Sequence, residues 1–162
     1  IATGNIVLTK EYVFRPGGSV AQAESNPVGK VLEVWQRPNK LKIKKLSIFT
    51  PYTDQINQSV IEYFKKENIE ISELSYFDIS SDLDIGKVDP NYLFDILTQK
   101  DLSSSDALFV SCTALPVLSI IKDLEKKLGK IVLSSNQTLI WDTLKQIDCK
   151  YKIEDYGELF NN

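Results

Sequence analysis

The chain has 162 residues, which suits a single domain with a hydrophobic core of its own. With 43% hydrophobic residues, 25% charged residues and a net charge of −3, the composition excludes a disordered chain and argues against nucleic acid as a partner. No apolar run approaches the roughly twenty residues that a membrane span needs, and the first residues lack the pattern of a secretory signal, so we expect a cytoplasmic protein that makes no use of a membrane.

Histidine is absent, and the sequence contains two cysteines. The missing histidine removes the commonest general base and the commonest zinc ligand, so any chemistry has to use a thiol, carboxylates, lysine, tyrosine or backbone dipoles. Nothing in the sequence pairs Cys112 with Cys149, and we expect a reduced protein. The chain begins with Ile1 and contains no methionine, which indicates a fragment or a processed chain.

In chain order, the first elements are a helix and a βαβ pattern. Apolar residues at helical spacing predict a helix over residues 27–36. Residues 41–49 alternate and then become continuously apolar, as a central strand does. Thr53 can cap a second helix, and residues 69–77 predict a second strand. Residues 78–89 are polar and irregular, and we interpret them as a lid or rim loop.

The alternation continues in the second half. A helix is predicted from Pro90 to about Gln99, followed by a loop. The apolar run at residues 107–110 indicates a buried parallel strand. The next helix is expected to have Pro116 near its first turn and Gly129 at its end.

A further strand is predicted to end near Ser135, and the last helix is expected after Gln137. Apolar residues would share one side of this helix: Leu139, Ile140, Leu144 and Ile147. The tail that begins at Cys149 is too apolar to be free in solution.

Strand and helix thus alternate four times, which predicts an α/β fold: a flavodoxin-like parallel sheet lobe with helices on both faces. Ligands of such sheets bind at the carboxyl ends of the strands, and Cys112 follows a strand at that end. Amides at the start of a helix favour an anion, so we expect this thiol to lose its proton more easily than a free one.

Four short segments, spread over residues 28–160, form a pattern in a fixed order. They are residues 50–54 (TPYTD) with Asn57, residues 111–113 (SCT), residues 134–137 (SSNQ) ahead of Trp141, and residues 156–159 (YGEL). The pattern resembles the maleate isomerase and arylmalonate decarboxylase group of the aspartate/glutamate racemase superfamily. The resemblance implies two pseudo-symmetric lobes: residues 1–40 as part of the first lobe with a connecting helix, residues 41–147 as a complete α/β lobe, and residues 148–162 as a tail that packs back toward the first lobe.

The resemblance also implies that Cys112 is an acid/base thiol that protonates or deprotonates a carbon next to a carboxylate. Hydrogen-bond donors would stabilise the resulting enediolate, and no cofactor is implied. The residues suggested for substrate binding are Tyr52, Asp82, Ser111, Thr113, Ser135 and Asn136. Simpler interpretations are a small buried residue for Cys112, a rim aromatic for Tyr52, and a plain helix cap for Ser135 and Asn136.

Two features depart from the family pattern. Isomerases of the group place an asparagine where this chain has Asp82, and an anion there would repel a dicarboxylate such as maleate. Family members also have a cysteine in a first-lobe loop of Cys-Thr-Ser-Gly-Ser type. Residues 2–5 (ATGN) could be a remnant of that loop but contain no cysteine, and an ordinary tight turn explains them more simply. A single catalytic cysteine, in the second lobe, is the pattern of the decarboxylase branch. In that branch, however, the cysteine has glycine neighbours, which this chain lacks.

Two functions stay open at this point. The leading hypothesis is a cofactor-independent isomerase, racemase or decarboxylase that acts on a small carboxylic acid through Cys112. The alternative is a non-catalytic binding or vestigial relative that has lost the first-lobe cysteine. An incomplete first lobe would leave an apolar face that favours a homo-oligomer. Cys149 is interpreted as structural, and the spacing of the acidic residues matches no calcium loop, so no metal site is expected.

Overall fold

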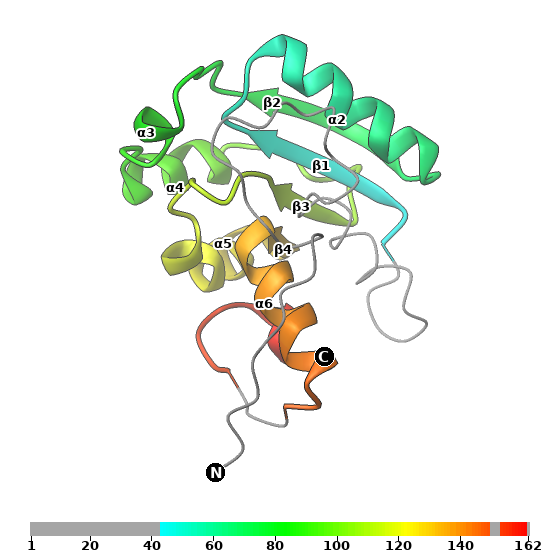
Figure 1. Cartoon of the computed structure of the whole chain (residues 1–162), viewed down its shortest axis with the longest axis vertical. Helices are drawn as coiled ribbons and strands as arrows, with labels where there is room; N and C mark the ends of the chain where they lie inside the picture. The colour runs from blue at the N-terminus through cyan, green and yellow to red at the C-terminus, as the bar shows by residue number, and fades with distance from the viewer. Residues whose placement is uncertain (1–42, 150–152, 162) are drawn as a thin grey trace.

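The computed structural model describes residues 43–149 and 153–161 (Figure 1). The predicted helix over residues 27–36, the turn at residues 2–5 and the first-lobe assignment of residues 1–40 lie outside the described residues. The division of the chain into three parts stays a prediction.

Four parallel strands form one sheet at the centre of the described fold. The strands are β1 (Lys45–Thr50), β2 (Glu70–Tyr76), β3 (Ala107–Val110) and β4 (Ile131–Ser134). Their order is β2-β1-β3-β4, and each neighbouring pair is parallel. The chain therefore winds outward in both directions from β1 and β3, which confirms the predicted flavodoxin-like α/β sheet.

Helices cover both faces of this sheet. They are α2 (Asp54–Lys66), α3 (Asp82–Ile85), α4 (Pro90–Thr98), α5 (Ile121–Leu128) and α6 (Ser135–Gln146), with 3-10 turns at Leu118–Ile120 and Glu158–Asn161. On one face, α2 and α6 contribute Phe64 and Trp141 to a core cluster. On the other face, α4 and α5 contribute Leu97 and Leu124 to a second cluster. No helix among the described residues combines the length and the apolar character needed to cross a membrane.

The two-sided core follows from alternation along the central strands. Leu46 and Ile48 of β1 face the cluster of α2 and α6, together with Phe109 of β3. Phe49, which follows Ile48, and Leu108, which precedes Phe109, face the opposite cluster. Because successive side chains of a strand point to opposite faces, a strand that is buried on both sides has to be apolar throughout.

Several predicted boundaries are confirmed. The apolar run 107–110 is strand β3, and the helix predicted from Pro90 is α4. Gly129 ends α5 in the left-handed conformation, with φ 63°, which glycine adopts without strain. Thr53 is the N-terminal capping residue of α2, although its side chain makes no capping hydrogen bond.

Two predictions about loops were wrong. Residues 78–89 are not irregular throughout, since they contain the short helix α3, in which Ile85 is buried in the core at 2% exposure. Pro116 does not lie in the first turn of α5, since α5 begins only at Ile121, after a 3-10 turn. An irregular segment therefore separates Cys112 from the start of the helix.

The last helix begins earlier than predicted. Its capping residue is Ser134, whose Oγ accepts a hydrogen bond from Gln137 N at 3.2 Å. In return, Gln137 Oε1 accepts from Ser134 N at 3.2 Å. This reciprocal capping box makes Ser135 the first helical residue rather than the cap.

The predicted core-facing side of α6 was also wrong in part. Ile140 is 42% exposed and Ile147, just beyond the helix, is 58% exposed. Trp141, at 8% exposure, and the fully buried Thr138 face inward instead.

We predict that Leu108→Ala lowers the free energy of unfolding by about 2–5 kcal/mol, because it leaves a cavity in the centre of the sheet. Leu83→Ala is the matched control: its side chain in α3 is 79% exposed, so the change should stay within about 0.5 kcal/mol. Urea unfolding followed by circular dichroism measures both. Equal losses in the two variants would contradict the described core.

Candidate active site

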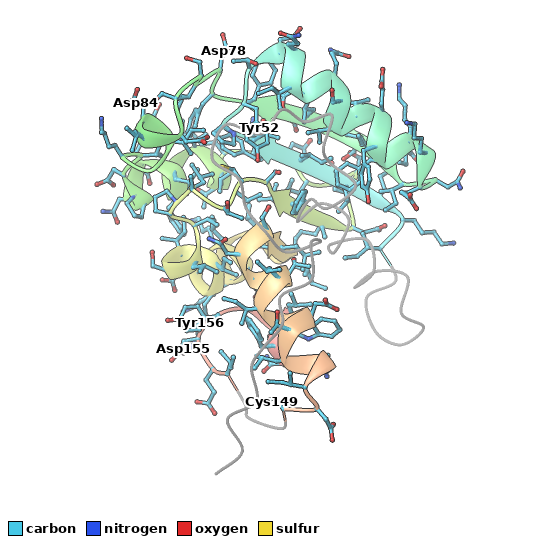
Figure 2. The ribbon with its side chains drawn as sticks, in the orientation of Figure 1. Tyr52, Asp78, Asp84, Cys149, Asp155 and Tyr156 are labelled. Carbon is cyan, nitrogen blue, oxygen red and sulfur yellow. The ribbon has the colours of Figure 1, made fainter. Side chains whose placement is uncertain are left out.

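The predicted site residues include three that follow different strands and lie at one edge of the sheet. Tyr52 follows β1, Cys112 follows β3, and Ser135 follows β4 directly. These are the carboxyl ends of parallel neighbours, so the residues converge although they are far apart in the sequence. Figure 2 shows Tyr52 at the tip of β1, with Cys149 at the far end of α6.

Cys112 has an unusual backbone conformation. Its φ of 102° lies in the region that side chains other than glycine rarely adopt. The Cys112 amide donates a hydrogen bond to Ser135 Oγ at 3.1 Å, and both residues are buried. This contact between the loop after β3 and the start of α6 helps to hold a conformation that costs energy locally.

The Cys112 thiol is 6% exposed, and burial raises its pKa above the ordinary value. Hydrogen bonds from the backbone amides of Ala114 and Leu115 and from the Tyr52 hydroxyl act in the opposite direction, but they do not outweigh burial. The expectation of a lowered pKa was therefore wrong. The physical reason is desolvation: burial of the thiol favours its neutral form more than the amides of the loop after β3 favour the thiolate.

Tyr52 presents its hydroxyl to the thiol. Burial raises the pKa of this phenol strongly, and the neighbouring Cys112 raises it further, so the hydroxyl keeps its proton and can donate it in a hydrogen bond. A buried polar pair fixes the Tyr52 backbone: Asn57 Nδ2 donates to Tyr52 O at 3.1 Å, and Tyr52 N donates to Thr50 Oγ1 at 3.2 Å. Thr50 Oγ1 in turn donates to Asn57 Oδ1 at 2.6 Å.

The sequence analysis placed Thr50 and Asn57 in the family pattern but gave neither residue a role of its own. Both are fully buried, and the signal for Asn57 was available. Asn57 shares the core-facing side of α2 with Val60 and Phe64, at helical spacing. A polar residue at such a position needs a hydrogen-bond partner, which here is the loop that carries Tyr52.

Ser111 offers a second hydroxyl near the thiol. It is 1% exposed, and within residues 43–149 and 153–161 its Oγ has no hydrogen-bond partner of regular geometry. Its proximity to the Tyr52 hydroxyl nevertheless acts to lower the pKa of Tyr52, against the larger effect of burial. A buried hydroxyl without a partner costs free energy, so it is available to a bound molecule.

Thr113 and Asn136 join the two loops behind the thiol. Asn136 Nδ2 donates to Thr113 O at 2.9 Å, and both side chains are half-buried. The structure thus brings six of the predicted residues together: Tyr52, Ser111, Cys112, Thr113, Ser135 and Asn136. Ser135 and Asn136 each make one of these hydrogen bonds, to Cys112 N and to Thr113 O. The interpretation of the two residues as plain helix caps was wrong, because the cap of α6 is Ser134.

Asp82 lies at the rim rather than within the buried group. It is the exposed first residue of α3, and its negative charge raises the pKa of both Cys112 and Tyr52. Helix α3 reaches the loop after β3 because Ile85 packs in the same core cluster as Cys112 and Leu115. Asp82 is thus a charged side chain at this rim, and both groups of the site respond to it.

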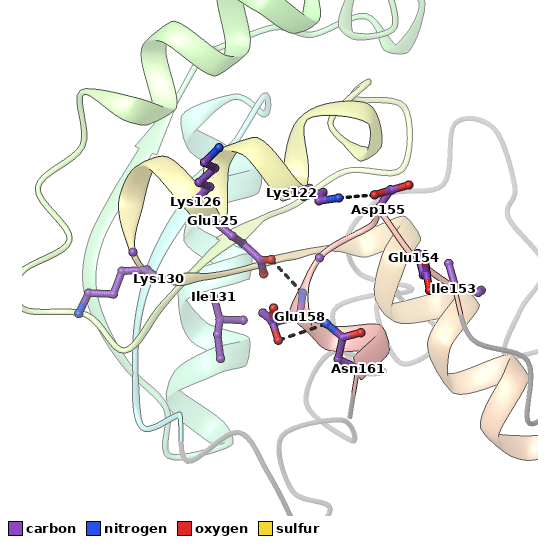
Figure 3. A pocket seen from close by; sticks show the side chains of 12 residues that line it. Lys122, Glu125, Lys126, Lys130, Ile131, Ile153, Glu154, Asp155, Glu158 and Asn161 are labelled. Atoms are coloured by element: carbon purple, nitrogen blue, oxygen red, sulfur yellow. Dashed lines mark hydrogen bonds and ion pairs between the residues drawn. The ribbon is translucent and has the colours of Figure 1, made fainter.

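Two features lie away from this site. Cys149 is half-buried beyond the end of α6 (Figure 2). A cavity of about 650 Å³ lies between α5 and the C-terminal segment, and none of the predicted site residues lines it (Figure 3). Within the described part of the chain, no three histidine, cysteine, aspartate or glutamate side chains gather as a metal ion would require.

Comparisons with known proteins agree on one group. The family model for arylmalonate decarboxylase matches residues 27–160. A maleate isomerase from Geobacillus stearothermophilus is 30% identical over 122 residues, which cover 75% of this chain and 49% of that protein. A maleate isomerase from Alcaligenes faecalis is 27% identical, with 73% and 47% covered. The chain thus spans about half the length of the curated relatives it matches.

A solved structure shares the fold. It is a maleate cis-trans isomerase from Nocardia farcinica, a cysteine-to-serine mutant with a covalently bound succinylcysteine intermediate. The TM-score is 0.76 at 21% identity, with 83% of this chain and 54% of that chain covered.

We predict that Asp82→Asn lowers the pKa of Cys112, because it removes a negative charge that favours the protonated thiol. The rate of Cys112 alkylation, followed by peptide mass spectrometry, should rise at a lower pH than in the unchanged protein. Asp84→Asn is the control, since Asp84 lies in the same helix but pairs with Lys87 at 2.8 Å. Equal shifts in both variants, or none in either, would contradict a specific effect of Asp82.

Proposed function

Because the chain belongs to the arylmalonate decarboxylase family, we propose that it acts on a small carboxylic acid as a cofactor-independent isomerase, racemase or decarboxylase. Cys112 exchanges a proton with the carbon next to the carboxylate. The membership agrees with the resemblance inferred from the four sequence segments. The observation that carries the proposal is the buried Cys112 thiol beside the Tyr52 hydroxyl, at the carboxyl edge of the sheet.

The raised pKa of Cys112 favours a thiol that holds its proton at neutral pH and donates it. In a decarboxylation, the bond from the α-carbon to the leaving carboxylate breaks, carbon dioxide departs, and the electron pair moves into the remaining carboxylate as an enediolate. The thiol proton then passes to the α-carbon, and water returns a proton to the thiolate. Racemisation or isomerisation would instead require the thiolate to act as a base or a nucleophile, which burial disfavours.

Donors for the enediolate oxygen are available beside the thiol. The Tyr52 hydroxyl keeps its proton because burial raises its pKa. The Ser111 hydroxyl is buried and lacks a regular partner among the described residues, and the half-buried Thr113 follows the thiol directly. Preorganised donors of this kind stabilise charge as it develops and need no rearrangement during the reaction.

The negative charge of Asp82 limits which substrate groups can lie beside α3. A carboxylate that faces α3 would meet the Asp82 anion, so the group on that side of the substrate should be neutral or a hydrogen-bond donor. Any dicarboxylate, whether maleate or a malonate, would have to place both of its carboxylates away from α3. A homo-oligomer that completes the cleft and a cytoplasmic location stay predictions.

A non-catalytic binding module is the second candidate, and one observation favours it. A thiol at 6% exposure with a raised pKa is also what an inert structural cysteine shows. The two candidates differ in whether the Cys112 proton reaches a bound carboxylic acid.

We expect proton NMR in heavy water to show turnover of at least one of three acids: deuterium at the α-carbon of the phenylacetate formed from phenylmalonate, deuterium at the α-carbon of aspartate, or conversion of maleate to fumarate. Cys112→Ala should lower the rate by about 10²-fold or more, because the proton donor is lost. Cys149→Ala is the control and should leave the rate unchanged. An equal rate in Cys112→Ala would overturn the assigned role of the thiol. If no acid is turned over but one protects Cys112 from alkylation, the binding module is the better description.

Tyr52→Phe tests the proposed donor to the enediolate. With an acid that is turned over, we expect the turnover rate to fall by about 10²-fold, because one stabilising hydrogen bond is lost at the developing charge. Tyr92→Phe is the matched control, since Tyr92 is 55% exposed on α4. Steady-state kinetics by NMR measures both, and an unchanged rate in Tyr52→Phe would remove Tyr52 from the mechanism.

A further inference from the structure

The C-terminal segment is held against the fold by two side chains from two helices. Gln137 Nε2 of α6 donates to Tyr156 O at 2.6 Å. Glu125 Oε2 of α5 accepts from Glu158 N at 2.8 Å, and this contact is visible in Figure 3. The two bonds grip the backbone on either side of Gly157, and we call this group, Glu125, Gln137 and the backbone of residues 156–158, the tail clamp.

Gly157 is required for this close approach. Its φ is 91°, and a Cβ atom there would lie 2.6 Å from Ile121 Cγ2 and 2.9 Å from Gln137 Nε2. Contacts that short force atoms apart. Any larger residue at this position would therefore push the segment away from Gln137.

Gln137 connects the tail to the start of α6. Its side chain is fully buried, and its two ends have different partners. While Nε2 binds the tail, Oε1 accepts from Ser134 N at 3.2 Å. The tail contact therefore fixes the orientation of the amide group that completes the capping box of α6.

The start of α6 is in turn connected to Cys112. Ser135, next to the capping residue, accepts the hydrogen bond from Cys112 N at 3.1 Å. A backbone with φ of 102° persists only where its surroundings over-determine it. A continuous path of short-range contacts thus runs from Tyr156 through Gln137 and the first turn of α6 to the residue that carries the thiol.

We propose that the tail clamp positions the Cys112 thiol, and that Gln137 and Gly157 are positioning residues of the site. Neither touches the reacting atoms. The effect on turnover rests on the proposed function, whereas the effect on the thiol itself does not. The tail also buries Leu159 completely, so its removal would unfold part of the core and would test nothing specific.

Gly157→Ala tests the proposal with Gly129→Ala as its matched control. Both glycines have positive φ, so both substitutions strain the backbone, but a Cβ at Gly129 meets nothing within 4 Å. We expect Gly157→Ala to raise the rate of Cys112 alkylation at least about fivefold and to shift its pH profile toward that of a free thiol, because the loop around the thiol relaxes and becomes wetter. Gly129→Ala carries the backbone strain without the clash, and it should change neither by more than about twofold.

Gln137→Glu is the second variant, in case Gly157→Ala does not fold. It keeps the size of the side chain but puts a carboxylate oxygen against Tyr156 O, so the tail contact is lost, and the same change in Cys112 alkylation is expected. In a Ser135→Ala background, which removes the acceptor for Cys112 N, neither variant should have a further effect on alkylation.

Native near-ultraviolet circular dichroism with unchanged Cys112 alkylation in both variants would overturn the proposal, as would an equal change in Gly129→Ala. If alkylation responds as expected but no acid is turned over, the positioning role holds and the proposed function fails. If an acid is turned over, Gly157→Ala should lower kcat more than it changes KM, because the thiol rather than the binding surface is displaced.

Discussion

The strained backbone of Cys112 is the constraint on which the rest of the site depends. A φ of 102° is unfavourable for any residue with a side chain, and here it orients the thiol toward the Tyr52 hydroxyl and under the loop that leads to α5. The hydrogen bond from Cys112 N to Ser135 Oγ ties this conformation to the first residue of α6. The sheet supplies the geometry, since the parallel pairing of β3 with β4 brings the two loops together.

The protonation state of the thiol follows from a competition between two physical effects. Desolvation favours the neutral thiol, whereas two backbone amides and the Tyr52 hydroxyl favour the thiolate. Desolvation has the larger effect and raises the pKa of Cys112, and the negative charge of the exposed Asp82 also raises it. A neutral thiol next to a neutral phenol is suited to the delivery of a proton, and the same two groups would be poorly suited to a reaction that begins with attack by sulfur.

The sequence predicted the fold well, and it indicated which residues lie together at the carboxyl edge of the sheet. Both depend on the order of apolar, polar and turn residues along the chain, which can be recognised without the folded structure. Both ends of strand β3 were predicted correctly, since four consecutive apolar residues bounded by polar ones are typical of a short buried strand. The family resemblance singled out Tyr52, Ser111 and Cys112, and the convergence of loops at the carboxyl ends of parallel strands explains why they lie together. The onset of α5 was misplaced because Pro116 suits a first helical turn, and nothing local reveals that a 3-10 turn comes first. The expected pKa of Cys112 was wrong for another reason, because the extent of its burial depends on packing that only the folded chain sets. The choice of Ser134 over Ser135 as the cap depended on the reach of Gln137, which only the folded backbone sets.

The contacts of Glu125 and Gln137 have a further consequence at the border of the sheet. Strand β4 ends the four-stranded sheet that the structure describes, so its outward amides lack a neighbouring strand. Glu125 Oε1 accepts from Val132 N at 3.0 Å, and Gln137 Oε1 accepts from Ser134 N at 3.2 Å. These are alternate residues of β4, whose amides point to the same side. The two side chains thus occupy the donors that another polypeptide would need for edge-to-edge pairing, and they protect the protein against aggregation through this strand.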